Sequence, residues 1–184
     1  QNCLAIDIAC GCGAFLFSLA DYLHSHCELS YREAVQRLYG VDISELSVNR
    51  CKILLSLAAL LNNEMLVDED FHISQGNSLE FDFTTMPRVV ENGGFDIVVG
   101  NPPYVRAKHI DDESKVLLSR WQVARCGNAD LYLPFFEIAC GILREDGVLG
   151  YITLNSFFKS VNARLLRSYF RSSNTCLLYT SPSP

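Results

Sequence analysis

The sequence predicts an α/β protein built on a doubly wound, mostly parallel β-sheet. Apolar stretches of strand length alternate with segments of helical apolar spacing along almost the whole chain. Strands that alternate with helices favour a parallel sheet, because each connection must return to the same end of the sheet. The 184 residues are 49% hydrophobic, which is enough for one substantial core. We therefore expect one domain over residues 1–171 and an unstructured or foreign tail over residues 172–184, where the periodicity is lost.

Hydrophobic periodicity and breaker residues place the individual elements. Strands are expected, in order, at residues 4–9, 38–43, 71–74, 95–99 and 148–154, and helices at 15–23, 31–37, 48–58, 112–125, 130–144 and 162–170. Ser44 is the expected N-cap of the third helix, since serine side chains accept hydrogen bonds from the first free helical N–H groups. The segment 105–127 is either a substrate-facing insertion or a packed surface helix with its flanking loops.

The net charge of −6 argues against a free-standing phosphate-binding surface. Two groups of basic residues are local exceptions: Lys159, Arg164, Arg167 and Arg171 near the end of the chain, and Arg106 and Lys108 after the fourth predicted strand. Each group is either a set of phosphate contacts or an ordinary solvated surface.

The eight cysteines lie among core-forming segments of a mid-sized chain, which favours reduced thiols and a cytoplasmic location over a disulfide framework. Cys10 and Cys12 have no second Cys or Cys/His pair at zinc-ligand spacing, so no metal site is expected. No apolar run is long enough to span a membrane, and no basic leader precedes an apolar segment.

Three strand ends carry residues suited to a nucleotide-like ligand. After the first strand, Gly11 and Gly13 permit close approach of the backbone to a ligand, and a helix with free N–H groups follows. A dinucleotide site would need a third glycine where Leu16 stands, which counts against NAD. Asp7 either meets a cationic group or holds the loop. Asp42, at the end of the second strand, is placed to accept ribose hydroxyls, and Asn77 is either an adenine contact or a turn residue.

The fourth strand runs directly into Asn101-Pro102-Pro103-Tyr104. The Asn101 side chain and the free carbonyl of Pro102 offer two acceptors, and Tyr104 offers a flat aromatic face. This set suits a planar aromatic amine, whose nitrogen would become more nucleophilic when both hydrogens are accepted. The alternative is a proline-rich strand exit with a packed tyrosine.

An ordered set of motifs resembles the catalytic domain of adenine-specific DNA methyltransferases of the type IIG restriction–modification kind. The matching segments are residues 7–16 (DIACGCGAFL), 40–43 (GVDI), 76–79 (GNSL), 101–106 (NPPYVR), 130–132 with 136–137, and 147–157. The family usually has proline where Ile8 stands, a small residue such as serine at Cys12, and often aspartate at Asn77.

The resemblance implies a Rossmann-like fold, S-adenosylmethionine as cofactor and methyl transfer to the N6 amine of an adenine flipped out of double-stranded DNA. It also implies a recognition domain and a cofactor-closing motif outside this sequence. The expected catalytic residues are Asn101, Pro102, Pro103 and Tyr104, and the expected cofactor-binding residues are Asp7, Ala9, Cys10, Gly11, Gly13, Phe15, Asp42, Ile43, Asn77, Ser78 and Asn101. Methylation of a protein glutamine or of a guanine amine in ribosomal RNA, or a silent cofactor-binding segment, are the alternatives.

Overall fold

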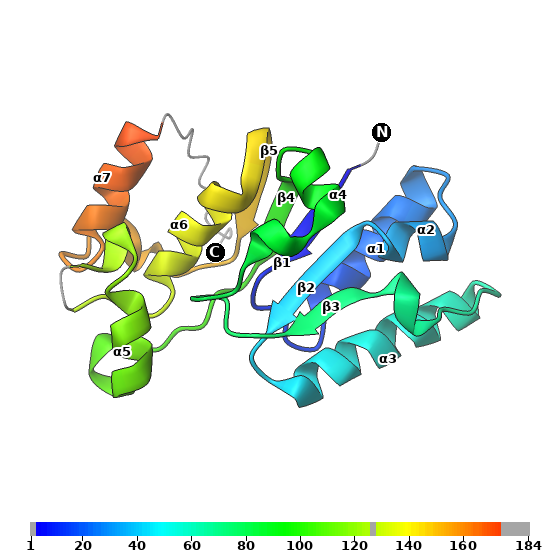
Figure 1. Cartoon of the computed structure of the whole chain (residues 1–184), viewed down its shortest axis with the longest axis horizontal. Coiled ribbons are helices and arrows are strands. Elements are labelled where there is room, and N and C mark those ends of the chain that lie inside the picture. The colour runs from blue at the N-terminus through cyan, green and yellow to red at the C-terminus, as the bar shows by residue number, and fades with distance from the viewer. Residues whose placement is uncertain (1–2, 126–127, 174–184) are drawn as a thin grey trace, which may run out of the picture. The chain divides into compact units, whose positions relative to one another are not determined.

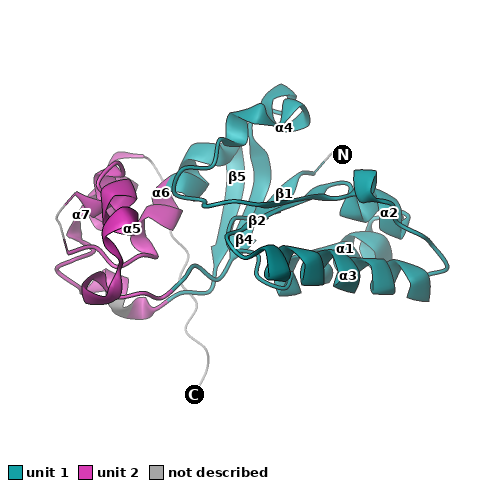
Figure 2. Cartoon of the chain, turned by 60° about the horizontal axis from the view of Figure 1, so that its bottom comes forward, with its two compact units in different colours: residues 1–103, 138–153 teal, residues 104–137, 154–184 magenta. Residues whose placement is uncertain are grey.

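The computed structural model of the chain describes residues 3–125 and 128–173 (Figure 1). The chain divides into two compact units, which Figure 2 shows in different colours. Unit 1 comprises Gln1–Pro103 and Ile138–Thr153, and unit 2 comprises Tyr104–Glu137 and Leu154–Pro184. The single domain expected over residues 1–171 stays a prediction. Residues 174–184 of the expected tail lie outside the described residues, while the last described helix continues to Ser172.

Unit 1 is built on a five-stranded sheet in the order β3-β2-β1-β4-β5. The strands are β1 (Ala5–Asp7), β2 (Leu38–Asp42), β3 (His72–Gln75), β4 (Phe95–Gly100) and β5 (Leu143–Tyr151). Every pairing in this sheet is parallel. The chain order reverses at β1, which pairs with β2 on one side and with β4 on the other. The predicted parallel α/β fold is confirmed, and the carboxyl ends of β1, β2 and β4 meet at one edge.

Helices cover both faces of this sheet (Figure 2). The helices of unit 1 are α1 (Ala14–His26), α2 (Tyr31–Val35), α3 (Glu45–Leu61) and α4 (Pro87–Glu91), with short 3-10 turns at Asp68–Asp70 and Phe83–Thr85; α6 (Leu133–Ile142) ends in this unit. The apolar sides of α1 and α3 form a buried core with the sheet, in which Leu16, Cys51 and Leu55 have no exposed surface. Ser44 caps α3 as predicted, because its hydroxyl accepts the Ser47 N–H at 3.2 Å.

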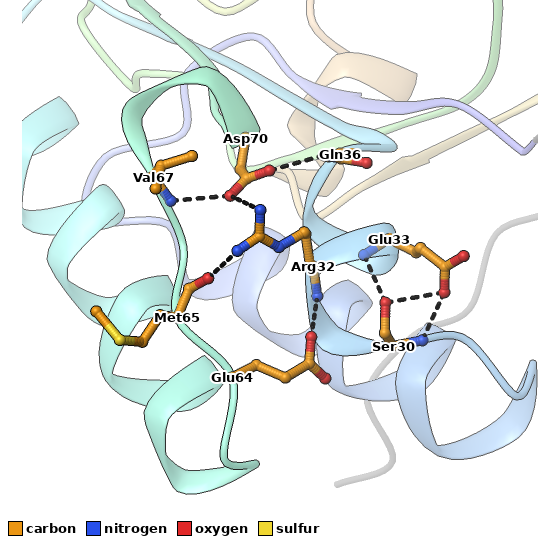
Figure 3. A network of polar contacts seen from close by, with 8 residues as sticks. All are labelled: Ser30, Arg32, Glu33, Gln36, Glu64, Met65, Val67 and Asp70. Atoms are coloured by element: carbon orange, nitrogen blue, oxygen red, sulfur yellow. Dashed lines mark hydrogen bonds and ion pairs between the residues drawn. The ribbon is translucent and has the colours of Figure 1, made fainter.

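A polar network fixes α2 to the turn that precedes β3 (Figure 3). The buried Asp70 carboxylate accepts hydrogen bonds from the Val67 N–H at 2.8 Å and from the Gln36 amide at 2.7 Å, and it forms an ion pair with Arg32 at 3.3 Å. Glu64 accepts the Arg32 N–H at 3.0 Å, at the first turn of α2. These contacts satisfy a buried charge that would otherwise destabilise the fold.

Unit 2 contains shorter helices around a cluster of aromatic rings. Its elements are η3 (Ala107–His109), α5 (Asp112–Leu118), η4 (Gln122–Ala124), the start of α6, η5 (Asn155–Phe158) and α7 (Arg164–Ser172). The Phe136 ring lies 5.5 Å from the ring of Phe157 and 5.6 Å from that of Phe170. Offset and edge-on contacts of this kind stabilise aromatic cores beyond the area they bury.

Several predicted boundaries are wrong. The helix expected over 112–125 ends at Leu118, where Arg120 and Trp121 turn back to bond carbonyls three residues earlier. The strand expected at 148–154 is β5, which begins earlier, at Leu143, and ends earlier, at Tyr151. Its ladder shifts register between Phe95 and Ile97, and Asp146 in this first part of β5 has a φ of 62°. The helix expected over 130–144 is correspondingly shorter. Within 3–125 and 128–173, no helix is both long and apolar enough to cross a membrane.

Candidate active site

The loop after β1 makes a tight turn that depends on glycine. The Cys10 N–H donates to the Val41 carbonyl at 3.1 Å, and the Gly13 N–H donates back to the Cys10 carbonyl at 2.8 Å. Gly11 and Gly13 have φ values of 53° and 86°, in the left-handed region that side chains disfavour. A Cβ at Gly13 would lie 2.2 Å from the Cys51 sulfur, whereas a Cβ at Gly11 would meet no atom within 4 Å. The loop is therefore packed underneath at Gly13 and open at Gly11.

The helix that follows this loop begins without a side-chain cap. Gly13 is the N-cap of α1 and offers no side-chain acceptor, while its carbonyl accepts the Phe17 N–H at 2.8 Å. The first N–H groups of the helix, next to Ala14 and the half-buried Phe15, keep the partial positive charge of a helix N-terminus. An anionic group is stabilised at such a position.

Asp42 ties the end of β2 to the glycine loop. One carboxylate oxygen accepts the Gly11 N–H at 2.8 Å and the other accepts the Ser44 N–H at 2.9 Å. A carboxylate accepts about four hydrogen bonds, so each oxygen keeps capacity for one further donor. The side chain of Ile43, the next residue, is 69% exposed. Asp42 thus holds the loop and still presents acceptors beside an exposed apolar side chain.

Asp7 is buried at the end of β1. Its carboxylate accepts the Ala9 N–H at 2.9 Å, and the backbone of Gly100 lies so close that a Cβ there would be 2.6 Å from the carboxylate oxygen. Burial raises the pKa of Asp7 from its ordinary 3.8 to about 7; the Ala9 N–H opposes this rise, and the nearby Asp42 adds to it. The Asp7 carboxyl therefore sits where a nearby cation would strongly favour its ionised form.

The turn after β3 contributes two of the expected residues. Ser78 is buried and its hydroxyl donates to the Ile8 carbonyl at 2.5 Å, which joins this turn to the end of β1. The Asn77 side-chain oxygen accepts the Leu79 N–H at 3.1 Å. Asn77 therefore has the turn role that the sequence left open, and its expected contact with a cofactor base stays a prediction.

The proline-rich exit from β4 leaves two acceptors unused. The Gly100 carbonyl accepts the Ile152 N–H at 3.0 Å, which fixes the end of the strand. Asn101 is exposed, Pro102 is buried and Pro103 is half-buried. Within the described part of the chain, neither the Asn101 carboxamide nor the Pro102 carbonyl makes a hydrogen bond.

Tyr104 follows directly in the chain and belongs to unit 2. It is 42% exposed, and its ring centre lies 6.2 Å from that of Tyr132. The chain beyond it is held by residues of the same unit: the Leu131 N–H donates to the Val105 carbonyl at 2.9 Å, and Asp130 accepts the Ala107 N–H at 3.0 Å. The backbone that follows Tyr104 is thus held in place while the Tyr104 side chain stays partly exposed.

The structure brings the expected residues of unit 1 to one edge of the sheet, at the ends of β1, β2, β3 and β4. Their assigned roles stay predictions. Sequence reasoning missed Cys51 and Gly100, which shape the site from beneath the loop and beside Asp7. One signal in the sequence indicated the contact between Cys51 and Gly13, namely the apolar spacing that places Cys51 on the buried side of α3. Among residues 3–125 and 128–173, no group of three His, Cys, Asp or Glu side chains is placed to hold a metal ion.

The chain has the Rossmann-like fold of S-adenosylmethionine-dependent methyltransferases: a parallel sheet, a glycine loop after β1 and an acidic residue at the end of β2. A putative class I S-adenosylmethionine-dependent methyltransferase from Listeria monocytogenes shares it, with a TM-score of 0.67 at 13% identity over 94% of this chain and 46% of that one. The profile of the Eco57I restriction-modification methylases matches residues 36–179, and the chain belongs to that family. The resemblance seen in the sequence motifs is thereby confirmed.

Two relatives carry informative names. The type II restriction enzyme and methyltransferase RM.Eco57I of Escherichia coli is 30% identical over 89% of this chain and 21% of its own length. The adenine-specific methyltransferase PglX of Streptomyces coelicolor is 28% identical over 76% of this chain and 15% of its own length. The chain thus spans about a fifth or less of each of these relatives.

Larger solved structures contain the same fold. The type IIL restriction-modification enzyme MmeI, solved in complex with DNA, superposes with a TM-score of 0.71 at 15% identity, over 94% of this chain and 27% of that one. A DrdV–DNA complex gives a TM-score of 0.69 at 18% identity, over 94% of this chain and 19% of that one.

Proposed function

We propose that this chain is the catalytic core of a DNA adenine methyltransferase, which transfers a methyl group from S-adenosylmethionine to the N6 amine of an adenine flipped out of duplex DNA. The observation that carries this proposal is the pair of unused acceptors at the end of β4, the Asn101 carboxamide and the Pro102 carbonyl. The family and the adenine-specific activity named for PglX support the choice of adenine.

The loop geometry fits the cofactor. S-adenosylmethionine, when bound, supplies a methyl group on a sulfonium that is already activated for attack. The open space above Gly11 allows close approach, and the uncapped start of α1 suits the carboxylate of the amino-acid part. The spare acceptor capacity of Asp42 suits the two ribose hydroxyls. Asp7, with its raised pKa, becomes ionised next to a cation and would add an attraction for the cofactor's positive charge.

The target amine is held by acceptors rather than deprotonated by a base. Asn101 and Pro102 each accept one N–H, which directs the nitrogen lone pair out of the ring plane and toward the methyl group. Transfer would form the N–C bond as the methyl C–S bond breaks, release the cofactor as a neutral thioether, and leave the nitrogen to lose its surplus proton to solvent. Alignment of this kind contributes most of the rate enhancement when no proton transfer is needed before attack. Extruding the base costs a few kcal/mol, and stacking on the exposed face of Tyr104 returns about 1–3 kcal/mol.

The test compares Asn101→Ala with Asn49→Ala, an exposed asparagine of α3. Labelled S-adenosylmethionine is incubated with duplex DNA, RNA and protein fractions, and cofactor binding is measured separately by calorimetry. We expect incorporation into N6 of DNA adenine, a fall in kcat of at least about 100-fold for Asn101→Ala, unchanged cofactor affinity and no effect of Asn49→Ala. Label in RNA or protein instead of DNA, or full activity of Asn101→Ala, would overturn the proposal.

A further inference from the structure

The charge of the chain is divided unequally between its two units. The 15 basic and 21 acidic residues separate into 6 basic and 16 acidic in unit 1, and 9 basic and 5 acidic in unit 2. The net charge of −6 is therefore the sum of −10 in unit 1 and +4 in unit 2. Unit 2 is a basic body within an acidic chain.

Almost all acidic side chains of unit 2 are engaged in the fold. Asp111 accepts the Ser114 N–H at 2.8 Å as the N-cap of α5, and Asp112 pairs with Lys115 at 2.8 Å. Asp130 accepts the Ala107 N–H at 3.0 Å, and Glu137 accepts the Val123 N–H at 2.9 Å. Glu113 is the one acid of the unit for which the described residues provide no such partner.

Most basic side chains of unit 2 are not engaged. Lys115 pairs with Asp112, and Arg167 donates to the carbonyls of Phe157 and Ser160, both at 2.7 Å. The other seven are exposed and have no hydrogen bond or ion pair to any described residue: Arg106, Lys108, Arg120, Arg125, Lys159, Arg164 and Arg171. In unit 1, by comparison, three of the six basic residues have acceptors within the fold: Arg32, Arg88 and Arg144.

The seven free cations belong to elements that pack together. Arg125 lines a cavity of about 170 Å³, whose wall also includes Ala107 and Ser119. Arg106 and Lys108 flank Ala107, and Arg120 follows Ser119, so four of the seven lie at or next to this cavity wall. Helix α7 packs against η4, the turn that precedes Arg125. Arg164 and Arg171 are seven residues apart on α7 and therefore lie on one side of it, about 10 Å apart along the axis.

We infer that unit 2 binds the phosphodiester backbone of double-stranded DNA through these seven cations. The inference rests on the proposed function and identifies the part of the chain that binds the DNA substrate. Free cations gathered on one small unit repel one another, and binding to a polyanion relieves this repulsion. The cations also displace counterions that are condensed on the DNA, and the release of these ions favours binding. Backbone contacts position the duplex without reading its sequence. Arg167, which the sequence also offered as a phosphate contact, is not included in this surface, because its guanidinium donates to the carbonyls of Phe157 and Ser160.

The test measures how the affinity of the full chain for a short mixed-sequence DNA duplex depends on salt. Arg120→Gln/Arg125→Gln and Arg164→Gln/Arg171→Gln each remove two cations from unit 2, and Arg50→Gln/Lys52→Gln removes two from unit 1 as a control of equal net charge. Each lost phosphate contact makes the slope of log K against log salt shallower by about 0.9, so each unit 2 pair should reduce it by about 1.8. The control pair should leave the slope unchanged.

A control variant that changes the slope as much as the unit 2 variants would overturn the inference, and so would tighter binding of a duplex RNA than of duplex DNA. Circular dichroism melting of each variant confirms that it is folded. The salt slope does not depend on methyl transfer. If the chain methylates DNA but the unit 2 substitutions leave the salt slope unchanged, this inference alone is refuted. If the unit 2 substitutions reduce the slope as expected but no methyl group is transferred to adenine, the proposed function alone is refuted.

Discussion

Replacing Gly13 by alanine should destabilise the chain through one identifiable contact. The left-handed φ of 86° costs an alanine about 1–2 kcal/mol. The new Cβ would also lie 2.2 Å from the Cys51 sulfur, and overpacking of a buried site adds about 1–3 kcal/mol. We expect a total loss of about 2–5 kcal/mol in the free energy of unfolding, measured by urea denaturation without cofactor.

Gly11→Ala is the matched control for backbone strain. Its φ of 53° is also left-handed, but no atom lies within 4 Å of the new Cβ, so only the conformational cost of about 1–2 kcal/mol applies. The gain from restricting the unfolded chain is common to both glycine substitutions and cancels from their difference. That difference therefore isolates the contact with Cys51.

A double-mutant cycle with Cys51→Ala then tests the contact directly. Removing the sulfur leaves the Cys51 Cβ at 3.1 Å, so most but not all of the overpacking is relieved. Gly13→Ala should cost about 1–3 kcal/mol less in the Cys51→Ala background than in the unmodified chain. Equal costs in the two backgrounds would refute the argument that Cys51 supports the loop from below.

Three further predictions concern carboxylates that are buried or that accept hydrogen bonds from the backbone. The folded pKa of Asp7, about 7, lies above the ordinary 3.8, so Asp7 stabilises the fold at low pH and loses that contribution as pH rises. Between pH 5 and 8 the free energy of unfolding should fall by about 2–3 kcal/mol relative to that of Asp7→Asn. Parallel pH profiles of the two proteins would contradict this. Asp42→Ala should weaken S-adenosylmethionine binding by about 10–100-fold in calorimetry, because charged hydrogen bonds are lost, and unchanged affinity would exclude the ribose role. Asp70→Ala should cost about 2–4 kcal/mol, since the Val67 N–H and the Gln36 amide lose their acceptor, whereas the exposed Asp68→Ala should be near neutral in the same urea titration.

The order of strands and helices could be predicted because β1, β2 and β4 carry mostly apolar, buried residues and the long helices α1 and α3 each carry one apolar side. Boundaries were less predictable where tertiary contacts decide them. The first strand was expected to reach residue 9 but ends at Asp7, because the Ile8 carbonyl bonds to Ser78 and the Ala9 N–H turns back to Asp7. Neither partner is visible from the local pattern. The same holds for β5, whose irregular start is set by its pairing with Phe95.

The expected site residues of unit 1 do converge at the edge of the sheet, because parallel strands end on the same side. Pattern alone could not show how their polar groups are used. Asp42 was expected to serve a ligand, and it also holds the backbone of Gly11 and Ser44. Asn77 looked equally suited to a ligand or a turn; its side-chain oxygen accepts the Leu79 N–H, and its contact with a cofactor base stays a prediction. A residue type gives its bonding capacity, whereas the fold determines how much of that capacity remains.

The net charge of the whole chain does not describe the charge of unit 2. A sum of −6 averages two units of opposite sign, and it counts an aspartate that caps α5 equally with a free arginine. In unit 2 four of the five carboxylates accept backbone N–H groups or pair with Lys115, while Arg106, Arg125 and the other free cations have no such partner. Electrostatic attraction for a polyanion depends on the local distribution of charge, so the basic character of this unit emerges only when the charges are counted for each unit separately.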